Sequence, residues 1–140
     1  MKKFFIPFYL VIIFFFFFCK SASRSDIKFF LDTHKNFYQS IKSYNDCLKK
    51  LIEKSILNDN IRLELTLAYK NYVLSQKAFY KMLKDDRYKS DFYVNTEEFM
   101  TISELKQQIK DEIKKNLNYK EKVLKIEGGR DFLEKLLLHR

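Results

Sequence analysis

The stretch that decides the fold is residues 26–57, DIKFFLDTHKNFYQSIKSYNDCLKKLIEKSIL. Its apolar residues recur at steps of three, four and seven, which is the spacing of one face of an α-helix. The stripe consists of Ile27, Phe30, Phe37, Ile41, Tyr44, Leu48 and Leu51, and it is widened on one flank by Leu31, Tyr38 and Ile52. His34 fills the gap in this stripe, where we expect a hydrogen-bonded core histidine. A face this broad is more typical of a helical bundle than of a two-stranded coiled coil.

A second helix is predicted from residue 61 to residue 84. The preceding Asn58-Asp59-Asn60 favours a helix end and a new start, because Asn and Asp side chains bond to nearby backbone groups. The apolar stripe of this helix is Ile61, Leu65, Ala68, Tyr72, Phe79 and Met82, interrupted by the small polar Ser75. A connection this short predicts that the first two helices are antiparallel.

Residues 85–94 are predicted to form a loop that carries Tyr88, Phe92 and Tyr93. We expect these aromatic side chains to pin the loop onto the core. The alternative is an exposed contact patch, because aromatic residues concentrate at binding hot spots.

A third helix has two capping-box patterns at its start, Asn95 with Glu98 and Thr101 with Glu104, and the sequence leaves both open. Its predicted stripe is Ile102, Leu105, Ile109, Ile113, Leu117 and Leu124. Gly128-Gly129 is expected to end it, because glycine favours the left-handed conformation that closes many helices.

Asp131 and Glu134 are predicted to cap a short last helix. Its apolar residues Phe132, Leu133, Leu136 and Leu137 need a docking groove, because a helix of about ten residues is not stable alone in water.

The fold class that follows is all-α, an antiparallel bundle of three long helices with a short C-terminal helix over residues 26–140. After the first eighteen residues the chain has no proline and only two glycines, whereas strand proteins need frequent turn residues. The length fits one domain. Cys47 is expected as a small buried apolar side chain, with pairing between chains as the alternative.

The N-terminus is typical of an export signal. Lys2 and Lys3 precede an apolar run from Phe4 to Phe18, and Cys19 follows. Three outcomes are consistent with this pattern. In the first, a signal peptide of residues 1–18 is removed, Cys19 carries a lipid and residues 19–25 form a polar tether. In the second, a signal peptidase cuts after Ser23. In the third, the segment stays as an anchor, although its sixteen uncharged residues span only about 24 Å of a hydrocarbon core about 30 Å thick.

The leader resembles that of spirochaete lipoproteins of the Borrelia surface type. The resemblance is carried by Lys2-Lys3, the Phe/Ile-rich run, Cys19 and the tether Lys20-Ser21-Ala22-Ser23. Phe18 departs from the pattern, which usually has a small residue before the cysteine. The resemblance implies a fatty-acylated (palmitate-bearing) Cys19, a place in the outer membrane at the cell surface, and an adhesin or immune-evasion role toward a host ligand.

No arrangement of residues in the sequence indicates catalysis. The glycine pair has no preceding strand, so it does not fit a phosphate-binding loop. His34 and His139 have no neighbouring His or Cys at metal-ligand spacing, and no nucleophilic triad is indicated. We therefore expect a protein that is not an enzyme and has no cofactor and no metal.

Lysines recur at helical spacing on the presumed exposed faces, and the formal net charge is +9. The two sets are Lys70, Lys77, Lys81 and Lys84 on the second helix and Lys106, Lys110 and Lys114 on the third. The set on the third helix is followed by Lys115, Lys120, Lys122 and Lys125. One interpretation is an ordinary solvated helix face. The other is a polyanion-binding patch for a host glycosaminoglycan, anionic lipid headgroups or an acidic serum or matrix protein. Nucleic acid is not an expected partner of an exported protein.

A different class of function is also consistent with the sequence. An uncleaved anchor would carry a coiled-coil structural or interaction protein in the periplasm, with no ligand-binding role. Such a stalk would pair with itself as a homodimer or with another envelope protein.

Overall fold

The computed structural model describes residues 23–89 and 100–138. Within these ranges the elements are α2 (Arg24–Lys54), α3 (Asp59–Leu83), the short 3-10 helix η1 (Asp86–Tyr88), α4 (Ile102–Val123) and α5 (Gly129–Leu138). The predicted signal segment, Cys19, Phe92, Tyr93 and the alternative cap at Asn95 lie outside the described residues.

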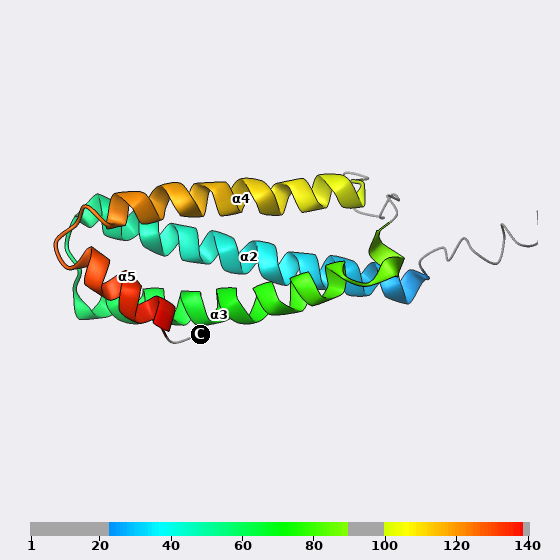
Figure 1. Ribbon diagram of the computed structural model, residues 1–140, viewed down its shortest axis with the longest axis horizontal. Helices are drawn as coiled ribbons and strands as arrows, with labels where there is room; N and C mark the ends of the chain where they lie inside the picture. The colour runs from blue at the N-terminus through cyan, green and yellow to red at the C-terminus, as the bar shows by residue number, and fades with distance from the viewer. Residues whose placement is uncertain (1–22, 90–99, 139–140) are drawn as a thin grey trace, which may run out of the picture.

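Three long helices lie side by side, with α2 between α3 and α4 (Figure 1). Along the chain, α3 runs back antiparallel to α2, and α4 then runs in the same direction as α2. The short α5 folds back over α3, where Phe132 lies under the guanidinium of Arg62 and Leu136 lies near Tyr69. The all-helical class and the three-plus-one arrangement are those that the sequence predicts.

The helix starts follow local capping chemistry. The Oγ of Ser23 accepts from the backbone N–H of Asp26 at 3.2 Å, and the Asp26 carboxylate accepts from the N–H of Ser23 at 3.1 Å. This capping box starts α2 at Arg24, two residues before the predicted Asp26, so the end of the predicted 19–25 tether is helical. Asn58 caps α3. Thr101 and Glu104 form the capping box that starts α4, as one of the two predicted patterns has it.

The end of α4 differs from the prediction. The helix stops at Val123 rather than at Gly128-Gly129. Gly128 has a φ of +74° and its carbonyl accepts from the N–H of Phe132, so it lies at the start of α5 and Asp131 falls in the first turn, not at the cap. A Cβ on Gly129 would lie 2.1 Å from the Val123 carbonyl oxygen, and this close approach requires glycine.

The predicted stripes of the first two helices form the core. On α2, the side chains of Phe30, Phe37 and Tyr44 are completely buried, and on α3 every predicted stripe residue is buried. The rings pack between helices, with Phe37 5.0 Å from Phe79 and Tyr44 5.4 Å from Tyr72. Burial of each such side chain contributes roughly 1.5–3 kcal/mol.

The predicted stripe of the third helix is wrong in its second half. Leu117 and Leu124 are 57% and 39% exposed, and Glu112, Asn116 and Val123 take the core positions instead. Asn45 of α2 explains the change, because its amide donates to a Glu112 carboxylate oxygen at 3.1 Å and its Oδ1 accepts from Asn116 at 2.8 Å. These hydrogen bonds satisfy polar groups that would otherwise be costly to bury.

His34 is the hydrogen-bonded core histidine that the stripe predicts. It is buried between Phe30, Tyr38 and Phe79, and its Nε2–H donates to the carbonyl oxygen of Leu105 at 2.9 Å. Burial lowers the pKa of His34, because the interior disfavours the charged imidazolium.

Tyr88 pins the loop after α3 to the bundle, as predicted for this residue. Its ring packs on Phe30 and its hydroxyl donates to the carbonyl oxygen of Asp26 at 3.0 Å. Beside it, the Arg87 guanidinium pairs with both Asp26 and Asp85. The start of α2 and the end of α3 are thereby joined.

Cys47 is half-buried and packs against the core. Burial raises the pKa of its thiol, so the neutral form is favoured. No helix within residues 23–89 and 100–138 is long and apolar enough to cross a bilayer.

Candidate anion-binding surface

The structure places the predicted lysines on two separate helices. Lys70, Lys77 and Lys81 are exposed on α3, and Lys84 is exposed at its C-cap. Lys110 and Lys114 are exposed on α4. Lys106 differs from the others. It is half-buried, and its Nζ donates to the carbonyl oxygen of Tyr88 at 3.2 Å, so it fastens α4 to η1.

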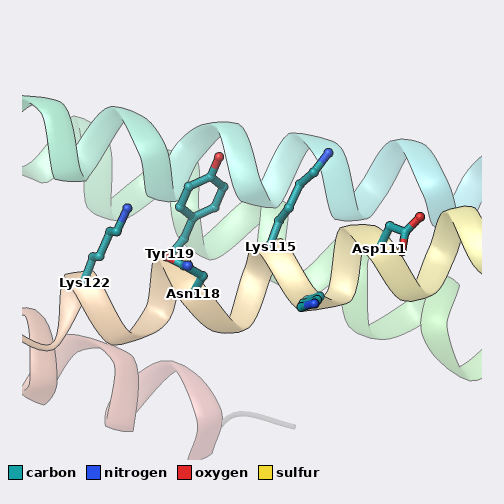
Figure 2. Close-up of a pocket in the computed structure, with 6 residues that line it drawn as sticks. Asp111, Lys115, Asn118, Tyr119 and Lys122 are labelled. Atoms are coloured by element: carbon teal, nitrogen blue, oxygen red, sulfur yellow. The ribbon is translucent and has the colours of Figure 1, made fainter.

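A basic depression lies along α4 where that helix meets α2 (Figure 2). It has a volume of about 410 Å³ and is lined by Asp111, Lys114, Lys115, Asn118, Tyr119 and Lys122. Lys115, Tyr119 and Lys122 extend from α4 toward α2 in Figure 2. Of the predicted lysines, only Lys114 lines it.

The charges of this basic depression favour an anionic ligand. Three of its lining residues are lysines and one is an aspartate. The ammonium group of Lys115 pairs with Glu112 at 2.7 Å, and the hydrogen bond to that carboxylate is the main cause of the raised pKa of Lys115. Glu112 is in turn held by Asn45, so the buried polar network that joins α2 to α4 also positions Lys115.

A second, smaller pocket lies between α3 and α4 beside the end of α5. Its volume is about 230 Å³. Lys77 enters it from α3 and Lys120 from α4, and the walls include Tyr69, Tyr72 and Leu137. Lys70 lines a neighbouring depression with Tyr69 and Leu136. Two of the predicted lysines, Lys70 and Lys77, therefore line depressions near α5.

The sequence analysis named Lys115 and Lys122 only as lysines that follow the aligned row, not as site residues, and it did not name Tyr119. The signal was present, because steps of four and three place these residues on one helix face with Asp111. The prediction followed the neighbouring row of Lys106, Lys110 and Lys114 instead. The decisive information was the orientation of α4, which the Asn45 hydrogen bonds set and the apolar pattern did not show.

These surfaces offer ammonium groups, phenol rings and amides, which suit binding of anions through point charges. Among residues 23–89 and 100–138, no three His, Cys, Asp or Glu side chains are grouped so that they would hold a metal ion. No protein-family model, curated protein or solved structure matches the chain.

Proposed function

We propose that the chain is an exported lipoprotein, anchored in the cell envelope through a lipid on Cys19, whose helical bundle binds a polyanion at the cell surface. A host glycosaminoglycan is the ligand class that fits best. The resemblance of the leader to Borrelia-type surface lipoproteins supports the proposed location at the cell surface and the adhesin role. The observation that carries the binding proposal is the basic depression on α4, where Lys114, Lys115 and Lys122 meet one aspartate.

The chemistry of lysine shapes what such a site would recognise. A lysine ammonium is a compact point charge, whereas arginine offers a planar fork for two parallel hydrogen bonds. The described residues that line the depression include three lysines and no arginine, so it should respond to the density of negative charge more than to the geometry of one group. Attraction between exposed charges is screened by salt, with a Debye length of about 10 Å at 0.1 M.

The binding proposal is tested by retention of the full chain on immobilised heparin. We expect retention at low salt that is lost as salt rises, and clearly weaker retention for Lys114→Gln combined with Lys122→Gln. The matched control is Lys81→Gln combined with Lys84→Gln, which removes the same charge from exposed positions at the C-terminal end of α3, outside the basic depression. Equal losses in the two double variants would contradict a site on α4.

The anchoring proposal is tested by metabolic labelling with a clickable fatty acid. The natural chain should incorporate the label and Cys19→Ser should not. A natural chain that keeps an intact, unlabelled N-terminus after membrane extraction would instead favour an uncleaved anchor.

One observation favours the alternative of a self-associating envelope protein. Leu63, Leu67 and Leu74 are 60%, 53% and 67% exposed on α3, and their spacing places them on one face. An exposed apolar stripe of this kind is typical of an interaction surface. Salt separates the two functions, because it screens attraction to a polyanion and also screens repulsion between two basic copies.

A further inference from the structure

We propose that the outward side of α3 docks on an anionic phospholipid surface, so that the bundle lies along the membrane to which its N-terminus is attached. We call this side the leucine–lysine face. Its residues are Leu63, Leu67, Lys70, Leu74, Lys77 and Lys81. The proposal deepens the proposed function, because it rests on the proposed anchor at Cys19 and names the surface that the anchored bundle turns toward the lipid.

The leucine–lysine face follows one line along α3. Steps of four and three residues separate its members, which places them on a single side of the helix over about 27 Å. All six residues are exposed, whereas Leu65, Tyr72 and Phe79 on the opposite side of α3 are buried in the core. The helices α2 and α5 contact other sides of α3, so the face is left open.

The charges along this part of α3 have one sign. From residue 65 to the C-cap at residue 84 the sequence contains four lysines and no Asp or Glu. The preceding acid, Glu64, pairs with Lys50 of α2 at 2.8 Å and so lies toward that helix. Anionic headgroups attract each lysine that lies near a membrane surface. The leucine–lysine face is therefore complementary in charge to an anionic lipid surface.

The alternation of leucines and lysines favours a lipid surface over a second copy of the chain. Two copies paired in parallel through this face would bring like lysines together, and an antiparallel pair matched over its full length would set lysines opposite leucines. Either arrangement would desolvate ammonium groups with no acidic partner from the face. At a membrane, leucines enter the headgroup boundary while the flexible lysine stems carry their ammonium groups to the phosphates.

The position of the N-terminus keeps the bundle close to the membrane. The helix α2 begins at Arg24, five residues after Cys19, and five residues of extended chain span at most about 18 Å. The hydroxyl of Tyr88, just after α3, donates to the carbonyl oxygen of Asp26, so the C-terminal end of α3 lies beside the start of α2. A lipid on Cys19 would therefore hold the lysine-rich end of the leucine–lysine face near the headgroups.

This orientation leaves the basic depression free for its own ligand. The helix α2 lies between α3 and α4 (Figure 1), and the basic depression lies along α4. A bundle that rests on α3 turns α4 away from the membrane. Lys114, Lys115 and Lys122 would then face a polyanion that approaches from outside.

The test uses the full chain extracted from membranes and reconstituted at one chain per nanodisc. Acetylation with a water-soluble reagent, read by mass spectrometry, measures how accessible each lysine is. We expect Lys70 and Lys77 to react at least about five-fold more slowly in discs of phosphatidylcholine and phosphatidylglycerol than in discs of phosphatidylcholine alone. The rates of Lys110 and Lys114 on α4 should differ by less than about two-fold between the two discs.

Two variants separate contact with lipid from the general effect of a charged surface. Leu67→Gln combined with Leu74→Gln keeps every charge and should remove most of the shielding. Because both leucines are exposed, helicity by circular dichroism should not change. Leu117→Gln on α4, where the leucine is also exposed, should leave the shielding intact.

Three results would overturn the docking face. They are equal lysine rates in the two kinds of disc, shielding that survives the double leucine variant, and equal shielding of the α4 lysines. Shielding found only when a disc holds two chains would also overturn it and would assign the face to a second copy.

The outcome is distinguishable from failure of the proposed anchor. A chain that incorporates fatty acid at Cys19 but shows no shielding of Lys70 and Lys77 would overturn the docking face and leave the anchor in place. A chain without the label that still shows the shielding would overturn the lipid and leave the docking face.

Discussion

Protonation of His34 is less favourable in the folded protein than in the unfolded chain. Because burial lowers its pKa, the unfolded chain takes up a proton first as the pH falls below about 6.5. The contribution of neutral His34 to stability is therefore complete above that pH and is lost as the pH drops toward the folded pKa. We expect the free energy of unfolding in urea to decrease between pH 7.5 and pH 5.5 by up to about 1.4 kcal/mol per pH unit.

The control for this prediction uses both histidines of the chain. His34→Gln replaces the ring with an amide that does not titrate, so most of the decrease between pH 7.5 and pH 5.5 should disappear. His139→Gln should retain the full decrease. If the two variants show the same pH dependence as the natural chain, the decrease comes from other groups.

Residue roles could be predicted where a single side chain interrupts or ends an apolar pattern. His34 falls inside the α2 stripe, so its burial and its need for a partner followed from position alone. Asn45 and Glu112 were not predictable in this way, because each looks like an ordinary polar residue of an exposed helix face. Their burial depends on each other across 67 positions of sequence, and local spacing carries no information about such a pair.

At the scale of elements, the hydrogen bonds between α2 and α4 set how these two helices face each other. Asn45→Ala would leave the Glu112 carboxylate and the Asn116 amide without their α2 partner in a buried site. We expect a loss of about 2 kcal/mol in the free energy of unfolding, measured by urea denaturation. The control is Asn71→Ala on the exposed face of α3, which should change stability by less than about 0.5 kcal/mol. An equally small change for both variants would mean that these hydrogen bonds do not hold the two helices together.

A second prediction at the scale of elements concerns the junction between α4 and α5. Gly129→Ala would place a methyl group 2.1 Å from the Val123 carbonyl oxygen, so α5 must shift away from its seat. We expect faster hydrogen exchange of the α5 amides and a loss of roughly 1–3 kcal/mol of stability. Gly128→Asn is the matched control, because asparagine tolerates a positive φ and a Cβ on Gly128 would meet only the Leu57 Cδ2, at an ordinary contact distance of 4.0 Å. Equal exchange rates in α5 for the two variants would contradict the close contact.

Helix starts were easier to predict than helix ends. Asn58 and Thr101 cap α3 and α4 through side-chain bonds to backbone groups three residues on, which is local chemistry. The capping box of Ser23 and Asp26 is equally local, and it was missed because Ser23 was assigned to the tether and Asp26 to the start of the helix. The end of α4 at Val123 depends on how closely α5 packs, which only the folded chain shows.

At the scale of the whole molecule, positive charge and apolar surface occur together on α3. Lys70 and Lys81 lie on the same face as the leucine stripe, and the chain as a whole carries a net charge of +9. Self-association would use this exposed surface of α3, whereas the proposed polyanion site lies on α4. Salt affects self-association and polyanion binding in opposite directions, because it screens attraction to a polyanion and also screens repulsion between two basic copies.

The opposite effects of salt on self-association and on polyanion binding can be measured. If two copies pair through Leu63, Leu67 and Leu74, sedimentation equilibrium of the full chain in detergent should show a dimer that strengthens between about 0.05 and 0.5 M NaCl. Leu67→Gln combined with Leu74→Gln should make the chain monomeric at both salt concentrations. Leu117→Gln on α4 is the control, because that leucine is similarly exposed on a different helix. A chain that is monomeric throughout, yet is released from heparin over the same range of salt, would contradict self-association and support polyanion binding on α4.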